Sequence, residues 1–553
     1  MKQRSAAVAG QGAATGILAG MAAVGVAYLV AGVTGAVGFP VVAVGELSID
    51  HTPPFVKNFA IREFGAQDKL VLLTGIAVIL TLFAAFIGVL AMRRPRYGLA
   101  GLGVFGAIGL IAVLTRPNAG AGDLLPTIAG VAAAVAAMWL LLRAARRPAA
   151  AAANSARVDT SAPARDAAAA DAAAGPAAPA VPSWAPRTAA VRAEAGEPAR
   201  RSFLLTGAAV AGTAVVAGTA GRLLLERGSV SSARSALRIP APHNAALPLP
   251  PGTDLKIPGL SSFLTPSSTF YRVDTAIVVP EVAPASWQLR IHGMVQREIV
   301  LTYRDLIRRP LTEEYITLAC VSNPVAGPYI GNARWLGASL RSLLREAGIR
   351  AGADQLLCTS ADGFTSGTPV QTAMDGRDAM LAVAMNGQPL PVGHGFPVRM
   401  VVPGLYGYVS ATKWITDIEV TTFAANTAYW PQRGWSQQAP IKTESRIDVP
   451  SGTAAVKPGK TAVAGVAWAQ HKGVDAVEVR ADSGPWNQAR LAAVPGIDTW
   501  RQWVWEDWNA TAGSHVLEVR ATDATGYTQT AAQVAPEPNG ATGYASVMVK
   551  VSA

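Results

Sequence analysis

Hydrophobic residues are concentrated in five long runs that contain no charged residue and lie in the first part of the chain. The runs cover residues 5–45, 70–92, 97–115, 124–142 and 202–221. Each is close to or longer than the ~18–20 apolar residues that a helix needs to cross the hydrocarbon core of a membrane. Four such runs within 142 residues are hard to reconcile with the buried helices of a soluble protein. The pattern therefore predicts five transmembrane helices.

Basic residues flank these runs on alternate sides, which predicts how the chain is oriented. Lys2 and Arg4 precede the first run, residues 93–96 (RRPR) join the second and third, and residues 143–148 (RAARRP) follow the fourth. Lysine and arginine beside a span are retained in the cytoplasm. If the spans alternate, residues 226–553 lie outside the cytoplasm.

The segment before the fifth run has two readable features. Residues 144–200 are dominated by alanine and proline, which predicts a flexible cytoplasmic linker. "ARRSFLLTGAAVAGTAVVAG" (residues 199–218) resembles a twin-arginine export signal. The alternative is that Arg200 and Arg201 form only the positive flank of a span. Under both interpretations, the residues after the fifth run lie outside the cytoplasm.

Further along the chain, the pattern changes to short strands mixed with short helices. Apolar and polar residues alternate in residues 286–295 (SWQLRIHGMV), which predicts a strand. Thr302, followed three residues later by Asp305, predicts the start of a helix. Residues 340–348 place three leucines on one helical face before a terminal glycine. We expect an α+β domain over residues 262–430.

The C-terminal residues repeat short strands separated by Gly, Pro, Asn and Asp turns, which is typical of an immunoglobulin-like β-sandwich. Four tryptophans of "TWRQWVWEDWNA" are expected mainly in its core, and a substrate-lining role is the lesser alternative. The chain is therefore expected to be a multi-domain protein. Its predicted parts are a four-helix transmembrane region (1–143), a disordered linker (144–200), a fifth transmembrane helix (201–225), an extended linker (226–261), the α+β domain (262–430) and the β-sandwich (436–553).

Composition excludes several classes of protein. Two cysteines, Cys320 and Cys358, cannot form a disulfide scaffold or a C-x-x-C metal site. The net charge of +11 does not indicate nucleic-acid binding, because the arginines cluster beside apolar runs and in a linker rather than on one basic face. None of the six histidines lies inside a predicted span, so paired imidazole ligands for a membrane haem are missing.

Several separate motifs in the α+β region resemble the oxidoreductase domain of the sulfite oxidase family, whose members bind molybdenum through molybdopterin. The resemblance covers about residues 262–425. Its most specific part is a long run ending in "HGFPVRMVVPGLYGYVSATKW". The motifs are "FYRVD" (270–274), "LACVSNP" (318–324), "NARWLGASL" (332–340), "SADGFTSGTP" (360–369) and the run 381–414.

The resemblance implies a site for molybdenum–molybdopterin. Cys320 would be the metal ligand, a role that suits a soft thiolate. Without its motif, a lone cysteine is usually a small buried apolar residue, and we interpret Cys358 in that way. Arginine and lysine side chains suit the phosphate of the pterin. The resemblance makes Cys320 and Arg334 catalytic, and Tyr271, Arg272, Asp274, Asn323, Asp362, His394, Arg399, Ala411, Thr412 and Lys413 cofactor-binding.

The sequence departs from the family pattern at the expected substrate site. Sulfite-oxidising members carry paired arginines after the metal cysteine, whereas Pro324 and Val325 stand here, and an expected tyrosine near "GFTSGTP" is missing. A desolvated dianion without matching cations binds poorly. Arg334 either remains as an anion contact or pairs within the structure. The sequence therefore favours a neutral S- or N-oxide or a small sulfur compound over sulfite.

Two functions remain open from the sequence. The leading hypothesis is a membrane-anchored oxidoreductase that performs two-electron oxygen-atom transfer on a small molecule at an extracytoplasmic site. No built-in haem or iron–sulfur motif is visible, so electrons would pass through a separate cytochrome or quinone-linked membrane protein. The C-terminal region resembles the family's dimerisation domain, which implies a homodimer. The alternative is a non-catalytic surface protein that retains a degenerate oxidoreductase fold.

Overall fold

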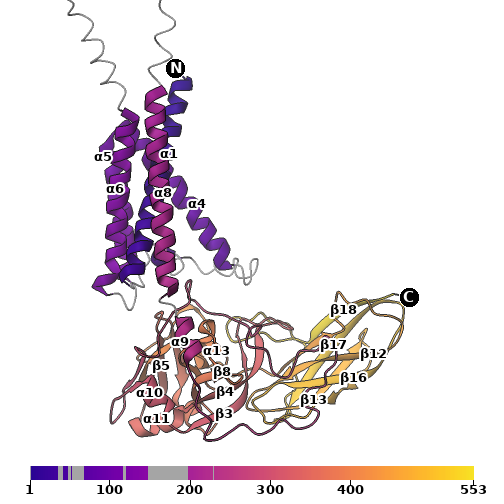
Figure 1. The fold of residues 1–553 in the computed structure, drawn as a ribbon. Helices are drawn as coiled ribbons and strands as arrows, with labels where there is room; N and C mark the ends of the chain where they lie inside the picture. The colour runs from indigo at the N-terminus through magenta and orange to yellow at the C-terminus, as the bar shows by residue number, and fades with distance from the viewer. Residues whose placement is uncertain are drawn as a thin grey trace, which may run out of the picture. The chain divides into compact units, whose positions relative to one another are not determined.

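A computed structural model describes residues 2–34, 42–45, 47, 52, 68–115, 120–146, 197–227 and 230–552. The chain divides into two compact units, Met1–Gly228 and Ser229–Ala553. The first is helical, and the second combines strands with short helices (Figure 1).

The first unit consists of long apolar helices. Proline stands at the first position of α5, where its missing amide hydrogen is not needed by the helix. Basic residues occupy the last turns of α4 and α6, where they interact favourably with the helix dipole. The described elements are α1 (Lys2–Thr34), α4 (Asp68–Arg93), α5 (Pro95–Leu114), η2 (Ala121–Leu124), α6 (Leu125–Arg146) and α8 (Glu197–Arg227).

Helix α1 packs against α4, α6 and α8 through small residues. A Cβ atom placed on Gly16 would overlap the carbonyl oxygen of Ala84 in α4, and one on Gly25 would overlap that of Ala214 in α8. Backbones therefore touch directly at both crossings. Close contact of this kind is characteristic of helix association in lipid, where apolar burial alone does not drive helices together.

Within the described residues, five helices are long and apolar enough to cross a membrane, which is consistent with membrane association. The first described helix reaches Thr34, inside the uncharged run 5–45, and residues 35–41 lie outside the described part of the chain. The candidate spans are Val8–Thr34, Val71–Arg93, Pro95–Leu114, Ala121–Arg146 and Arg201–Ala236.

The segment expected to be a linker is helical at both ends. Helix α6 continues to Arg146, because alanine is a strong helix former, and α8 begins at Glu197. Residues 147–196 of the predicted linker lie outside the described residues. The twin-arginine interpretation of Arg200 and Arg201 stays a prediction.

The second unit opens with a short helix inside the segment predicted to be extended, residues 226–261. Helix α9 (Val230–Ala236) forms because Val230 is buried in an apolar cluster and Arg234 donates to the backbone carbonyls of Leu390 and Pro389 at 2.7 and 2.8 Å. The residues that follow α9 up to position 287 contain no long regular element within the described range.

Two sheets form the α+β part of this unit. Leu289 and Ile291 of the predicted strand 286–295 are buried in β1, which confirms the alternation. One sheet has the order β2-β1-β10-β5-β6, with β1 (Gln288–Gly293), β2 (Ile299–Thr302), β5 (Gln355–Ser360), β6 (Thr365–Pro369) and β10 (Ile415–Thr421). The other has the order β3-β4-β7-β8, with β3 (Leu311–Ala319), β4 (Ile330–Ser339), β7 (Met380–Met385), β8 (Gln388–Pro389) and, paired with β7, β9 (Arg399–Val401).

Two of the short helices, those that start at Tyr303 and at Leu340, form at the predicted signals. The Thr302 hydroxyl accepts from the Asp305 amide, and the Asp305 carboxylate accepts from the Thr302 amide, forming the capping box. Gly348 ends α11 with a φ of +70°. The helical elements are α10 (Tyr303–Ile307), α11 (Leu340–Ala347), α12 (Val370–Met374), α13 (Gly407–Ser410), η3 (Val392–His394) and η4 (Pro431–Arg433).

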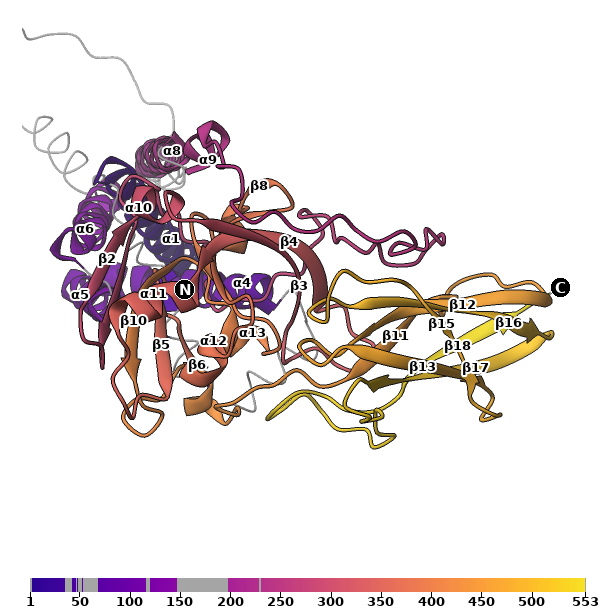
Figure 2. The ribbon, with the colours of Figure 1, turned by 90° about the horizontal axis from the view of Figure 1, so that it is seen from below.

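The C-terminal part contains two antiparallel four-stranded sheets, as expected for a β-sandwich (Figure 2). Trp503 and Trp508 are buried in the core between its strands, which supports the packing role expected for the tryptophan-rich segment. The sheets are β11 (Glu444–Val449), β12 (Gly459–Trp468), β16 (Arg501–Ala510) and β15 (Arg490–Leu491), and β14 (Asn487–Gln488), β13 (Val474–Ala481), β17 (Gly513–Asp523) and β18 (Ala545–Val551).

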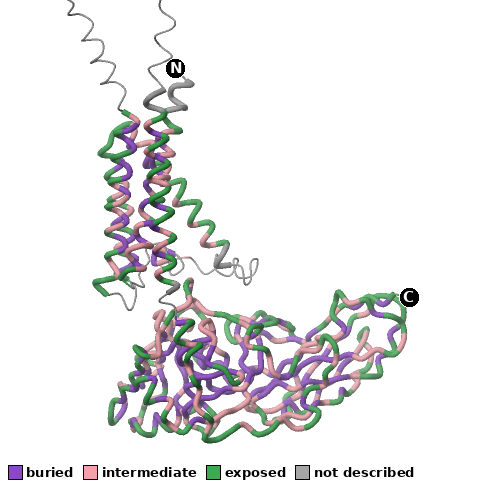
Figure 3. The backbone as a smooth tube through the Cα atoms, viewed as in Figure 1, coloured by how far each residue is buried: buried purple, intermediate pink, exposed green. Residues whose placement is uncertain are grey.

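The two parts of the second unit share buried residues. Buried positions are concentrated in the interior of both parts (Figure 3). Trp468 and Trp500 of the C-terminal part belong to the same apolar cluster as the α+β strands. The Trp500 indole donates to the Phe263 carbonyl at 2.9 Å, and Arg446 of β11 donates to the Gly327 carbonyl at 2.8 Å. The loop that follows Cys320 is thereby held against β11.

Candidate molybdopterin site

The thiol of Cys320 lies directly after β3, at the start of the loop that leads to β4. The Cys320 amide donates to the Tyr329 carbonyl at 2.9 Å, which closes the loop at its base. The sulfur lies 2.9 Å from the Ser322 hydroxyl. Cys320 retains partial exposure, whereas Cys358 is fully buried within β5. Cys358 therefore behaves as the packed apolar residue that its surroundings predict.

The protein alone does not activate this thiol. Burial raises the pKa of Cys320, and the Ser322 hydrogen bonds and the Lys413 charge lower it by less. A bound metal cation holds a coordinating thiol deprotonated. The Cys320 thiol is therefore better suited to be a metal ligand than a free nucleophile.

Asn323 holds the loop beside the thiol. Its amide donates to the Cys320 carbonyl at 3.1 Å, and its side-chain oxygen accepts from the Tyr329 amide at 2.8 Å. The side chain is buried, and its Nδ2 has no hydrogen-bond partner among the described residues. One donor of Asn323 therefore remains available to a ligand.

Arg399 is a buried guanidinium with no paired carboxylate in the described part of the chain. It is 4% exposed and donates to the carbonyls of His394 and Ala411 at 3.2 and 3.1 Å. Its Nε finds no acceptor there, and the group lies 5.0 Å from the ring centre of Trp335. Burial lowers the pKa of Arg399 to about 10, so the group stays cationic. A buried cation of this kind is costly unless an anion compensates it.

Lys413, Arg272 and Asp274 form an ion-pair cluster. Asp274 lies 2.9 Å from the Lys413 Nζ and 2.7 Å from the Arg272 Nε. Burial lowers the pKa of Lys413 to about 8 although Asp274 opposes the shift. Gly395, with a φ of +107°, allows the backbones to converge, because a Cβ there would lie 2.9 Å from the Arg399 Cβ and 3.2 Å from the Lys413 Cα.

His394 presents a neutral imidazole. Its ring packs edge-on against Phe270, with ring centres 5.6 Å apart. Burial, followed by the charges of Arg399, Lys413 and Arg272, lowers the pKa of His394 to about 3. The ring therefore offers one donor and one acceptor nitrogen at neutral pH.

Tyr271, Ala411 and Thr412 complete the neighbourhood. Tyr271 stacks on Phe270 at 5.2 Å, and a Cβ on Gly407 would lie 3.9 Å from its hydroxyl and 3.7 Å from the Ala411 Cβ. Burial and the Cys320 thiol both raise the pKa of Tyr271. The Thr412 hydroxyl lies 2.6 Å from that of Ser366, an interaction that the sequence did not indicate.

Two predicted site residues, Arg334 and Asp362, have their observed side-chain partners outside this cluster. Arg334 lies opposite Tyr315 in the β3–β4 pairing, five residues along the strand from Cys320, which corresponds to about 16 Å. Its Nε is 3.3 Å from the Glu313 carboxylate. Of the two alternatives for Arg334, the pairing within the structure is therefore the one observed. Asp362 lies in the β5–β6 turn and accepts from the Phe364 amide at 3.2 Å.

The sequence analysis did not identify Trp335, an aromatic residue that packs against the cluster. Trp335 is fully buried, donates to the Ile316 carbonyl at 3.1 Å and lies against Arg399. The motif "NARW" contains this tryptophan next to the predicted arginine, and an aromatic residue beside a cationic site was the available signal.

The residues that are present fit a molybdopterin cofactor. Three cations, Arg272, Arg399 and Lys413, are compensated by the single carboxylate of Asp274 in this cluster. The unpaired Arg399 Nε and Asn323 Nδ2 are buried donors without acceptors among the described residues. An anionic phosphate would supply the missing charge and the missing acceptors. The thiol within electrostatic reach of Lys413 supplies a soft ligand for a metal.

Comparison with known proteins agrees with this chemistry. Residues 276–430 match the family described as the oxidoreductase molybdopterin-binding domain. The chain carries a molybdopterin-binding oxidoreductase domain. This domain contains Cys320 and Lys413, while Tyr271 to Asp274 precede the matched stretch. The match implies molybdenum–molybdopterin as the cofactor and supports an oxidoreductase.

Relatives of the molybdopterin-binding domain include sulfite oxidases. The chain is 33% identical to sulfite oxidase from Gallus gallus over 296 residues, which cover 45% of this chain and 63% of the relative. It is 28% identical to sulfite oxidase from Arabidopsis thaliana over 285 residues, 43% of this chain and 72% of the relative. The crystal structure of the sulfane dehydrogenase SoxCD from Paracoccus pantotrophus aligns with a TM-score of 0.46 and 23% identity over 56% of this chain and 89% of that chain.

The chain spans only part of the length of these relatives. The chain spans 63% of the Gallus gallus protein and 53% of mitochondrial sulfite oxidase from Mus musculus, at 33% and 30% identity.

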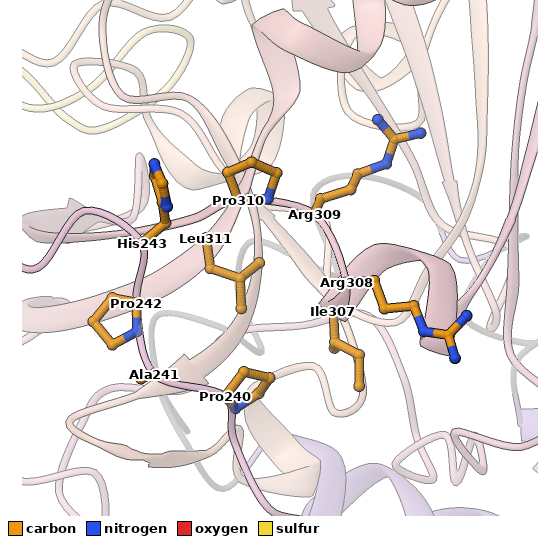
Figure 4. Close-up of a pocket in the computed structure, with 9 residues that line it drawn as sticks. All are labelled: Pro240, Ala241, Pro242, His243, Ile307, Arg308, Arg309, Pro310 and Leu311. Atoms are coloured by element: carbon orange, nitrogen blue, oxygen red, sulfur yellow. The ribbon is translucent and has the colours of Figure 1, made fainter.

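A surface pocket elsewhere in the unit is separate from this site. It lies between residues 240–243 and 307–311 and encloses about 450 Å³ (Figure 4). The guanidinium groups of Arg308 and Arg309 point away from Pro240 and Pro242 on the opposite wall. The predicted site residues, all of which the structure describes, do not line it. The buried cluster around Cys320, not this hollow, is therefore the candidate site.

Proposed function

We propose that this chain is a membrane-anchored molybdopterin-dependent oxidoreductase that catalyses two-electron oxygen-atom transfer at an extracytoplasmic site. The observation that carries the proposal is a buried, under-compensated cationic cluster within electrostatic reach of one partly exposed thiol. Buried charges in a protein interior are usually paired. Here Arg399 lacks a carboxylate among the described residues.

Each residue of the cluster has a role in holding the cofactor. Arg399 and Lys413 bind the phosphate, Arg399 through its free Nε. Neutral His394 and the Asn323 amide bind polar edges of the pterin, and Asp274 fixes the position of Lys413. Cys320 provides the protein ligand to molybdenum. The bound group supplies the two-electron oxygen-atom chemistry, while these residues position it.

The substrate proposed is a neutral S- or N-oxide or a small sulfur compound rather than sulfite. Val325 stands where sulfite-oxidising proteins are expected to place an arginine, and its side chain packs against the apolar core of the C-terminal part. Arg334 is engaged with Glu313. Neither position thus offers a free cation to a dianion. Several relatives are named sulfite oxidases, so sulfite is the competing outcome of the test.

The remaining parts of the proposal concern location and partners. Five candidate spans and the alternation of basic segments support an anchored chain with its oxidoreductase domain outside the cytoplasm. A separate cytochrome or quinone-linked membrane protein would exchange the electrons. The C-terminal sandwich would support a homodimer.

Turnover measurements on the full chain test the proposal. The protein would be purified in detergent from a host that makes molybdopterin and assayed with dye electron carriers against a sulfoxide, an N-oxide and sulfite. We expect turnover of an oxide and little turnover of sulfite. Faster turnover of sulfite would overturn the substrate assignment. Absence of molybdenum from repeated loaded preparations would favour the non-catalytic surface protein.

A further inference from the structure

The loop that carries the predicted metal ligand also carries a hydroxyl group that contacts the ligand's sulfur. The Ser322 Oγ lies 2.9 Å from the Cys320 Sγ. The serine is half-buried, and the sulfur is the one hydrogen-bond partner found for its hydroxyl among the described residues. The family resemblance assigns roles to Cys320 and Asn323, on either side of this serine, and none to Ser322. Ser322 is therefore a candidate to act on the metal through its ligand.

A β-turn holds the serine and the cysteine in this arrangement. The Asn323 amide donates to the Cys320 carbonyl at 3.1 Å, which closes a four-residue turn with Val321 and Ser322 at its centre. Val321 is 5% exposed and belongs to the apolar core of the α+β part, so its side chain anchors the turn. The short side chain of Ser322 is thus positioned at the sulfur by the backbone of the turn.

The rest of the loop is held at several further points. The Asn323 Oδ1 accepts from the Tyr329 amide at 2.8 Å. A Cβ on Gly327 would overlap the Asn323 Oδ1, so no side chain fits at that position. Arg446 of β11 donates to the Gly327 carbonyl at 2.8 Å and fixes the loop from the C-terminal part. These contacts restrict the movement that would take the Ser322 hydroxyl away from the sulfur.

Metal binding decides the direction of this hydrogen bond. In the cofactor-free chain either atom can be the donor, because the thiol and the hydroxyl each carry a proton. A thiol that coordinates a metal is deprotonated, so its sulfur can only accept. The Ser322 hydroxyl must then donate to the Cys320 sulfur. Hydrogen bonds to an ionised acceptor are roughly twice as strong as those between neutral groups.

A hydrogen bond to a ligand sulfur affects the metal that the sulfur binds. The bond draws electron density from the thiolate, which then donates less to the metal, so the reduced state of the metal is favoured. The alternative is that Ser322 serves only the turn, since serine in a turn commonly bonds to the backbone. The described residues provide no backbone partner for this hydroxyl, whereas they do provide the sulfur.

We propose that Ser322 is a positioning residue whose hydroxyl donates a hydrogen bond to the Cys320 sulfur and thereby raises the reduction potential of the metal bound there. The inference rests on the proposed function, because it requires a metal on Cys320. It names a residue that sets the balance between the oxidised and reduced states of the site. No bond to Ser322 forms or breaks in the reaction, and the serine exchanges neither protons nor electrons with the substrate.

The test is a redox titration of the loaded full chain, followed by absorption. Ser322→Ala should contain as much molybdenum and pterin as wild type, but its metal should be harder to reduce. Loss of a hydrogen bond to a charged group should change the ratio of oxidised to reduced centre by ~10-fold, which for a two-electron couple lowers the midpoint potential by ~30 mV. The charge-transfer absorption should move to longer wavelength, because a sulfur without the hydrogen bond gives up electron density more easily.

Two further substitutions separate the hydroxyl from the packing of the turn. Ser322→Thr and Ser322→Val introduce side chains of similar shape that differ by the hydroxyl. The threonine variant should keep the wild-type potential and absorption, and the valine variant should match alanine. Ser339→Ala is the control for a serine hydroxyl lost elsewhere, because Ser339 caps α11 by accepting from the Ser342 amide at 3.3 Å. It should lower the melting temperature and leave the potential unchanged.

The outcomes separate this proposal from the proposed function. If wild type carries molybdenum on Cys320 but Ser322→Ala keeps its potential and absorption, the hydrogen bond does not tune the metal and the proposed function stands. Equal shifts in the threonine and valine variants would show that turn packing is responsible, which also overturns the proposal; this pair decides if the alanine variant does not fold. If wild type loads no molybdenum, or binds it without the Cys320 sulfur, the proposed function fails and this proposal fails with it.

Discussion

Replacement of Arg399 by alanine should release the cofactor without unfolding the domain. Arg399 is buried, has no carboxylate partner among the described residues and keeps one donor free. If that donor binds the phosphate, its loss leaves a buried anion facing only Lys413 and Arg272. Truncation of one member of a buried charge pair costs ~2–5 kcal/mol, which corresponds to ~30- to ~4000-fold weaker binding.

Two further variants separate charge from geometry and from general damage. Arg399→Lys keeps the charge but loses the planar fork, so its affinity for the cofactor should fall between wild type and alanine. Arg377→Ala is the matched control, because Arg377 is also largely buried and donates to the Pro403 carbonyl, but pairs with Asp375 outside the site. It should lower thermal stability and leave pterin binding unchanged.

The assay is pterin content after dialysis of the purified full chain, with the melting temperature recorded in parallel. Arg399→Ala should lose its pterin during a dialysis in which wild type and Arg377→Ala retain theirs. Retention equal to wild type, or an equal loss in the Arg377→Ala control, would show that the cationic cluster does not hold the phosphate.

Three other predictions follow from the same structure. Cys320→Ser should retain pterin, which is bound elsewhere in the site, but lose the charge-transfer absorption and most turnover; wild-type absorption and turnover would mean that the sulfur is only packed. Glu314→Gln should raise the melting temperature above pH 7 and not below pH 4.5, because burial raises the pKa of Glu314 from 4.5 to about 7. As the pH rises, the Glu314 carboxyl ionises at a lower pH in the unfolded chain than in the folded one, so the wild-type protein loses ~1 kcal/mol of folding stability between pH 4.5 and about 7, after allowance for the half-exposed side chain. An equal effect of the substitution at both pH values would contradict the raised pKa of Glu314. In a Cys320→Ser background, Ser161→Cys should not react with a membrane-impermeant thiol reagent in intact cells, whereas Ser286→Cys should react. Labelling at position 161 would contradict the predicted topology.

Local patterns predicted much of the fold. The Thr302–Asp305 capping box, the end of α11 at Gly348 and the buried alternation in β1 each depend on residues a few positions apart. Such interactions can be read from spacing. The apolar helices were equally readable, because their length and lack of charge are properties of one continuous segment.

Features that depend on strand register could not be predicted in this way. The β3–β4 pairing places Arg334 opposite Tyr315 and brings its guanidinium to Glu313, which the sequence left open as one of two alternatives. The contact of Arg399 with Trp335 joins residues 64 positions apart. The hydrogen bond from the Trp500 indole to the Phe263 carbonyl joins residues 237 positions apart, so it also depends on how the C-terminal part packs against the α+β part.

The central claim is that Cys320 and the cationic cluster hold a molybdenum–molybdopterin centre. The most direct measurement is metal and pterin analysis of the full chain from a molybdopterin-producing host, with X-ray absorption to count the sulfur ligands of the metal. We predict about one molybdenum and one pterin per chain, with one sulfur ligand fewer in Cys320→Ser. A chain that carries pterin with the same sulfur coordination in both proteins, or that carries no molybdenum at all, would contradict the account.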